Sequence, residues 1–242
     1  MSYISAKGKD AAKAATEEKK DFSKALVPFK SGTTYKVRLA SDEDFVEYYA
    51  ANVFKVFYTT PVTPGSLYQK AADALYKAAK DAATEAEAEE LRNYAYQLKP
   101  KPRYLFGFIN LADGEPIVVD LTKAQAQVVI SAIEKYAKKI NKVAFELSKE
   151  GSGTSTTVSL SPVLDMDEDL TETERKNFDE ADGKEIPDEL YENVLYVKDE
   201  SEQLEDLRNF AQKFNLDIGV LGIDETKEVE PIEDEEAPED VF

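Results

Sequence analysis

Apolar and polar side chains alternate along several short stretches of the chain, and this spacing predicts β-strands. In residues 34–39 the apolar positions alternate with Thr, Lys and Arg, so one face of that strand is expected in the core and the other to be basic. Two later strands are joined by an expected turn at Asp113-Gly114. Six short strands are predicted in all, at residues 34–39, 52–60, 103–110, 116–121, 143–147 and 156–160.

Apolar residues at helical intervals mark other parts of the chain. Residues 66–98 are rich in Ala, Lys and Glu, and Thr84 followed by Glu87 fits a capping box. This pattern predicts a helical hairpin broken near Ala83, inserted between two strands. A further helix is expected before the last two strands, and short helices near the C-terminus, at residues 122–141, 190–197 and 204–214.

The order of these elements predicts a mainly β fold with helices. Short strands with one helix before the final pair favour a small Greek-key barrel of the OB type, which would carry a helical insertion and C-terminal helices. A generic α+β sheet domain is the competing interpretation. The predicted organisation is a basic N-terminal arm, an OB-fold core with a helical insertion, an acidic helical extension and a disordered acidic tail, at residues 1–30, 31–162 with 66–98, 163–222 and 223–242.

Charge is divided unequally along the chain. The whole sequence carries a net charge of −19, but residues 1–150 hold 23 Lys and Arg against 20 Asp and Glu. The remaining residues hold 7 against 29, so all of the net acidity lies in the C-terminal part. A polyanion-binding body with an acidic tail has this asymmetry, although a tail that only keeps a protein soluble would have the same composition.

The residue types that are missing exclude several functions. The sequence has no Cys and no His, which removes disulfides, thiolate zinc sites, imidazole bases and the usual catalytic triads. A nuclease that binds Mg²⁺ through carboxylates remains open, but no spacing of Asp, Glu and Lys in the predicted strands resembles one. We therefore expect no enzyme, no cofactor and no metal. No apolar run approaches the roughly 18 residues of a membrane span, so a cytoplasmic protein without membrane contact is expected.

Several segments, in their order along the chain, resemble the single-stranded-DNA-binding proteins of tailed bacteriophages, most closely the helix-destabilising protein of the T-even phages. A basic arm precedes "GTTYKVRL", and "KPKPRYLFGF" is similar to that family's basic lead into an aromatic strand. The segments "VAFEL", "TVSLSP", "DELYENVLYV" and "EQLEDLRNFAQKF" and an acidic tail follow in the same order. The T-even protein holds zinc through Cys and His, which this chain lacks, so no zinc role is carried over.

The resemblance implies binding of single-stranded DNA in phage DNA replication, recombination and repair, in the cytoplasm of the host cell. It also implies that the acidic tail recruits replication proteins such as polymerase, helicase or primase, through Asp240, Val241 and Phe242 at its end. By its charge, the tail could also occupy a basic groove until DNA displaces it. The alternative is an acidic protein-interaction or DNA-mimic module.

Sequence-independent binding of single strands needs cations along the phosphates and aromatic rings on which bases stack. If Leu105 and Ile109 face the core, period two places three rings together on the opposite face of their strand. The competing interpretation is that the Phe rings are buried, beneath the helical insertion for instance. The candidate DNA-binding residues are Lys36, Arg38, Lys55, Tyr58, Lys99, Lys101, Arg103, Tyr104, Phe106 and Phe108.

Overall fold

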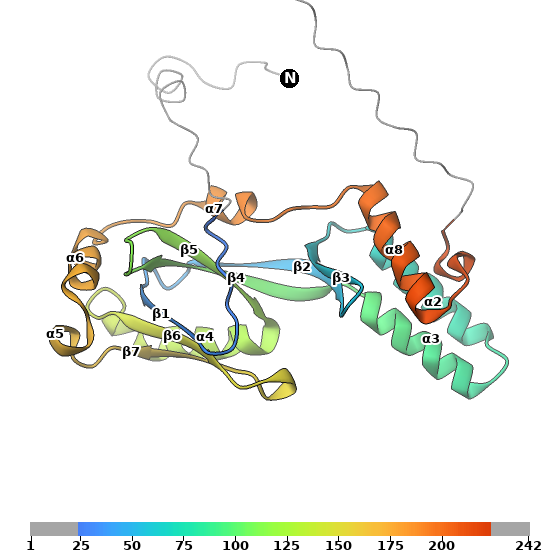
Figure 1. Ribbon diagram of the computed structural model, residues 1–242, viewed down its shortest axis with the longest axis horizontal. Coiled ribbons are helices and arrows are strands. Elements are labelled where there is room, and N and C mark those ends of the chain that lie inside the picture. Colours follow the sequence, from blue (N-terminus) through green and yellow to red (C-terminus); the bar gives the residue numbers. More distant parts are fainter. Residues whose placement is uncertain (1–23, 224–242) are drawn as a thin grey trace, which may run out of the picture. The chain divides into compact units, whose positions relative to one another are not determined.

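The computed structural model describes residues 24–223 (Figure 1). Most of the predicted N-terminal arm and almost all of the predicted tail, with Asp240, Val241 and Phe242, lie outside the described residues. The described part is a mixed α/β structure with a curled antiparallel sheet and seven α-helices. This architecture is compatible with an OB-like fold.

Seven strands form the sheet within the described residues. Their order is β3-β2-β4-β1-β6-β7, and β5 pairs with β4. The prediction of one strand over residues 52–60 is wrong, because a turn at residues 54–56 divides this run into the end of β2 and all of β3. The pairing of these two strands shifts between Ala51 and Val53, as a β-bulge does. The strands are β1 Thr33–Arg38, β2 Phe45–Val53, β3 Phe57–Pro61, β4 Lys101–Asn110, β5 Pro116–Thr122, β6 Phe145–Glu150 and β7 Thr157–Pro162.

Two helices begin directly after a capping threonine, Thr84 as the sequence pattern predicts and Thr122 at the start of the expected helix over residues 122–141. Thr84 accepts a hydrogen bond from the backbone N–H of Glu87, although the Glu87 carboxylate accepts from Ala83 rather than closing the box on Thr84. The box of Thr122 with Gln125 is complete. The helices are α2 Leu67–Asp81, α3 Glu85–Leu98, α4 Lys123–Tyr136, α5 Met166–Asp169, α6 Glu172–Glu180, α7 Asp188–Asn193 and α8 Glu200–Phe214.

The chain divides into two compact units. Of the described residues, the first unit takes 24–46 and 105–194, and the second takes 47–104 and 195–223. The first contains β1, β5, β6, β7 and α4 to α7, with α4 in contact with β7. The second contains β3, α2, α3 and α8, and the long strands β2 and β4 contribute residues to both.

The predicted helical insertion has its own core in the second unit. The helices α2 and α3 pack against each other and α2 contacts α8, so that a C-terminal helix completes the insertion (Figure 1). Tyr68 on α2 is fully buried, and its hydroxyl donates to the Asp206 carboxylate on α8 at 2.5 Å. Lys198 donates to the same Asp206 oxygen at 2.7 Å. Burial, followed by the hydrogen bond to Asp206, raises the pKa of the Tyr68 hydroxyl, so it remains a donor at neutral pH.

Candidate nucleic-acid interface

The structure corrects the prediction for two of the three rings on β4. Phe106 and Phe108 are each only 1 % exposed, and every residue from Leu105 to Ile109 is buried. The Phe106 ring stacks on the ring of Phe45 with centroids 5.1 Å apart. The prediction that these two rings stand on an exposed face is therefore wrong, and neither presents a surface on which a base could stack.

The C-terminal extension packs on the opposite face of this part of β4, the face that Leu105, Gly107 and Ile109 share. A Cβ atom added to Gly107 would lie 2.5 Å from the Tyr191 hydroxyl and 2.8 Å from the Ile186 side chain, so these side chains touch the strand backbone. Burial raises the pKa of the Tyr191 hydroxyl well above its ordinary value. Period-two alternation could not have predicted this packing, because the covering residues lie some 80 positions away in the sequence.

Tyr104, the third ring, lies in the second unit and is partly exposed. Its hydroxyl donates to the carboxylate of Glu47 on β2, and this hydrogen bond raises the pKa of Tyr104. Successive residues of a strand point to opposite faces, so Lys101 and Arg103 project from the face of β4 opposite Tyr104. Tyr104 therefore does not share a face with these cations.

The acidic extension engages both predicted cations of β1. Arg38 is only 3 % exposed and donates to the Phe178 carbonyl at 2.6 Å and to the Asp182 carboxylate at 2.5 Å. Its guanidinium also lies 4.4 Å from the centre of the Phe178 ring. The prediction that Arg38 is available for phosphate is wrong, since its donors are directed at the protein's own oxygens.

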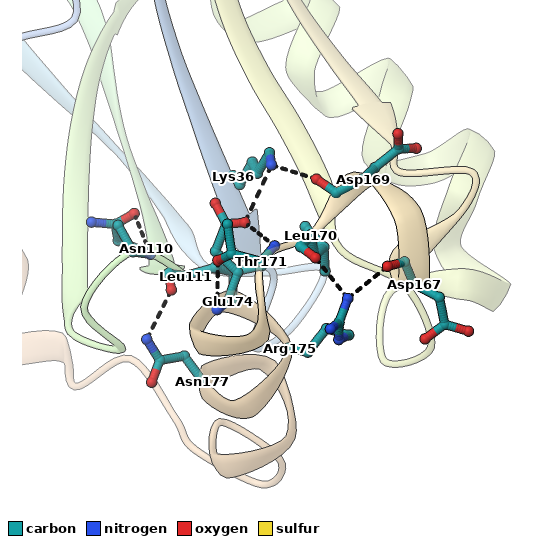
Figure 2. Close-up of polar contacts among 11 residues, drawn as sticks. Lys36, Asn110, Leu111, Asp167, Asp169, Leu170, Thr171, Glu174, Arg175 and Asn177 are labelled. Atoms are coloured by element: carbon teal, nitrogen blue, oxygen red, sulfur yellow. Dashed lines mark hydrogen bonds and ion pairs between the residues drawn. The ribbon is translucent and has the colours of Figure 1, made fainter.

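Lys36 is also held by the extension, as Figure 2 shows. Its ammonium donates to the carbonyl of Asp169 at 2.5 Å and to the carboxylate of Glu174 at 3.2 Å. Asn177 on the same helix donates to the carbonyl of Leu111 at 2.8 Å, which fixes α6 to the body of the first unit. The expected open basic face of β1 is thus an internal contact with α5 and α6.

The contact between Lys36 and Glu174 should make the first unit sensitive to acid. Partial burial acts to raise the pKa of Glu174, but its interactions with Thr171 and Lys36 outweigh burial and lower that pKa below the ordinary 4.5. A carboxylate with a lowered pKa stabilises the fold above pH 4.5, and this contribution is lost as the pH falls through the lowered pKa.

We therefore expect Glu174→Gln to lower the free energy of unfolding at pH 7, and the difference from the unchanged protein to shrink below pH 4.5. Urea denaturation at a series of pH values measures both proteins. Glu172→Gln is the matched control, because it removes an exposed carboxylate from the same turn of α6 and leaves the contact between Lys36 and Glu174 in place. A constant difference for Glu174→Gln down to pH 3 would contradict the assigned role of the carboxylate.

Two of the remaining candidates lie on the hairpin of β2 and β3. Lys55 is in the turn, with a positive φ of 61°, and Tyr58 on β3 is 93 % exposed. Phe54, which sequence reasoning did not select, is 80 % exposed, and the Lys55 ammonium lies 5.3 Å from the centre of its ring. A lysine next to an exposed ring can contact a phosphate while the ring stacks on the adjacent base.

A second group lies where α3 ends and β4 begins. Lys99 is exposed at the C-cap of α3, and Lys101 places its ammonium 4.1 Å from the centre of the largely exposed Tyr96 ring. Tyr49 on β2 is also largely exposed, while Arg103 is partly buried and has contacts of its own. The sequence held one signal for Tyr96, because it falls outside the apolar stripe formed by Leu91, Tyr94, Ala95 and Leu98 on α3.

We give one name, the ring-and-lysine surface, to these two groups of exposed or partly exposed residues in the second unit, one on the hairpin of β2 and β3 and one where α3 meets β4. Its rings and ammonium groups are the two components that sequence-independent binding of single strands requires. The surface comprises Tyr49, Phe54, Lys55, Tyr58, Tyr96, Lys99 and Lys101.

Comparison with known proteins adds no relative, since no protein-family model and no curated protein matches the chain. Within residues 24–223 no group of three or more acidic side chains is placed to hold a metal ion. In that same part of the chain, no helix combines the length and apolar character that crossing a membrane requires.

Proposed function

We propose that this protein binds single-stranded DNA without sequence preference, through the ring-and-lysine surface. The observation that carries the proposal is the exposure of four large rings, Tyr49, Phe54, Tyr58 and Tyr96, in the same unit as three exposed or partly exposed lysines. A single exposed ring is ordinary on a protein surface. Here the Lys55 ammonium lies over the Phe54 ring and the Lys101 ammonium over the Tyr96 ring, and rings beside cations are the groups that proteins use to bind single strands by stacking and phosphate contact.

The resemblance to the tailed-phage proteins supports the biological part of the proposal. The protein would coat single strands during phage DNA replication, recombination and repair in the host cytoplasm, without a cofactor and without catalysis. The finer fold assignment, an OB-like Greek-key barrel, belongs to the same proposal. It is supported by the curled antiparallel sheet and by helix α4, which precedes the last two strands as the sequence pattern predicted. The acidic tail would compete with DNA and recruit polymerase, helicase or primase.

The second candidate function is an acidic protein-interaction or DNA-mimic module. A specific observation favours it, because carboxylates of the extension already contact the cations of β1: Asp182 binds Arg38, and Glu174 binds Lys36. In this candidate the extension is the functional surface and would present its acidic groups to a basic partner.

A titration with oligo-dT at two salt concentrations tests the proposal. Binding should quench tyrosine fluorescence, which no Trp obscures, and should weaken steeply with salt because phosphate contacts release counterions. The slope of log affinity against log salt should be about −0.7 for each phosphate contacted. Absence of binding even at low salt would refute DNA binding and leave the acidic module as the remaining candidate.

A further inference from the structure

A pocket of about 320 Å³ opens next to the ring-and-lysine surface, within the second unit. Tyr49 on β2 and Pro100 at the end of α3 form part of its lining, and the loop between β3 and α2 forms much of the rest. The lining is predominantly apolar, and its residues are Tyr49, Val62, Thr63, Pro64, Gly65, Gln69 and Pro100. The volume falls at the lower end of the range of about 300–1,000 Å³ for small-ligand sites.

The loop that builds the pocket is held in place by local hydrogen bonds. Ser66 caps α2 by accepting from the Gln69 backbone N–H, and its own N–H donates to the carbonyl of Thr63 at 3.2 Å. Gly65 adopts a positive φ of 85°, and no atom lies within 4 Å of the place where its Cβ would be. The chain therefore adopts at Gly65 a conformation that favours glycine, and a Cβ there would meet open space.

The chemistry of the lining suits one flat heteroaromatic group. The Tyr49 ring and the proline rings offer apolar surfaces on which such a group can pack. Gln69 supplies the polar group, and its amide nitrogen donates to Asp73 at 2.8 Å, which orients the amide. An amide carries both a donor and an acceptor, so it can meet the polar edge of any nucleobase.

The charges beside the pocket favour an anionic chain that carries this group. Lys99 and Lys101 flank Pro100 in the sequence, and Lys99 is exposed. Among residues 24–223, the pocket lining contains no acidic side chain that would repel a phosphate. The pocket thus combines an apolar recess with two lysines that adjoin one of its lining residues, Pro100, in the sequence.

We propose that this pocket takes a single unstacked nucleobase of the bound strand, while Lys99 contacts the phosphate next to it. The inference rests on the proposed function, and it adds a specific base site to the stacking surface. The site would accept any of the bases, because its contacts are a ring face, proline rings and a single amide. An extruded base in an apolar pocket is a mode of binding that nucleic-acid-binding proteins use.

Blocking the pocket tests this proposal in the full-length protein. Thr63→Trp places an indole at the mouth, and the exposed position of Thr63 keeps the substitution out of the core. Thr59→Trp, at an exposed position of β3 outside the pocket lining, is the matched control. Each variant is titrated with oligo-dT and with an oligonucleotide of equal length whose residues are all abasic, and thermal unfolding verifies that each is folded.

We expect Thr63→Trp to bind oligo-dT about fivefold or more weakly than the unchanged protein does. Its affinity for the abasic strand should stay within about twofold of that of the unchanged protein. Thr59→Trp should bind both strands within about twofold of the unchanged protein. Equal binding of oligo-dT by Thr63→Trp and the unchanged protein would overturn the base site and leave DNA binding intact. If the unchanged protein bound oligo-dT and the abasic strand equally well, the base site would also be refuted. If it bound neither strand, the proposed function itself would fail.

Gln69→Ala gives a second measurement that does not depend on tolerance of the indole. It removes the amide from the pocket and should also weaken oligo-dT selectively, about threefold or more, because one hydrogen bond to the base edge is lost. Tyr49→Ala, which removes the aromatic ring of the pocket, is measured beside it. Should Thr63→Trp fail to fold, the base site would be overturned if the two single variants, Gln69→Ala and Tyr49→Ala, both bound oligo-dT as the unchanged protein does.

Discussion

Replacing Lys99 and Lys101 together by alanine should weaken binding of oligo-dT at low salt more than any other surface change. Each ammonium that contacts a phosphate contributes about 0.7 to the slope of log affinity against log salt, so the double variant should lose about 1.4 from that slope. If the two salt dependences converge near 1 M salt, the loss at about 0.05 M is roughly 60-fold. Fluorescence anisotropy with labelled oligo-dT at four salt concentrations measures both values.

The matched control for this experiment removes the same charge elsewhere in the second unit. Lys77 and Lys80 are exposed on α2 and lie outside the ring-and-lysine surface, so Lys77→Ala with Lys80→Ala should change the slope little. Equal losses in the two double variants would mean that only the net charge of the protein matters. Such a result would contradict direct phosphate contacts by Lys99 and Lys101.

Replacing Phe106 by alanine should have the second large effect, on stability rather than on DNA contact. The ring is 1 % exposed and stacked on Phe45, so its removal leaves a cavity and should cost about 3–5 kcal/mol of unfolding free energy. Urea denaturation, followed by circular dichroism, measures this loss. A folded Phe106→Ala protein of normal stability that had lost DNA binding would contradict the buried position of the ring.

Tyr58→Ala is the companion to this variant, because it removes a ring that is 93 % exposed. Its stability should stay within about 0.5 kcal/mol of the unchanged protein, as surface substitutions usually do. Its affinity for oligo-dT should fall about fivefold or more, since one base loses its stacking partner. The two variants together separate rings that build the core from rings that face solvent.

Local sequence patterns were sufficient for many of the elements. The break between α2 and α3, the capping of α4 by Thr122 and the turn at Gly114 follow from interactions among residues that are near neighbours in the chain. The prediction of one strand over residues 52–60 was wrong for a physical reason. Val53, Phe54 and Val56 all favour β-structure, whereas the turn at residues 54–56 depends on the pairing of β2 with β3. Composition likewise excluded thiolate and imidazole chemistry without any structure.

The candidate site was less predictable, because it depends on which residues the tertiary packing covers. Lys36, Arg38, Phe106 and Phe108 are attractive ligands for DNA by residue type, yet the extension engages the first two, and the two Phe rings are buried in the core. Tyr49 and Tyr96 are candidates because the packed helices and strands leave both rings outside the core. Alternation assigns a residue to a face of a strand, and it does not say what lies on that face.

By itself, the sequence determined the local elements, the separation of acidic from basic halves and the absence of thiol and imidazole groups, because all three depend on residue types and short spacings. Only the tertiary structure decided which rings and cations face solvent. Burial depends on contacts between residues far apart in the chain, such as Tyr191 against Gly107 and Asp182 against Arg38, and no short-range pattern encodes those contacts.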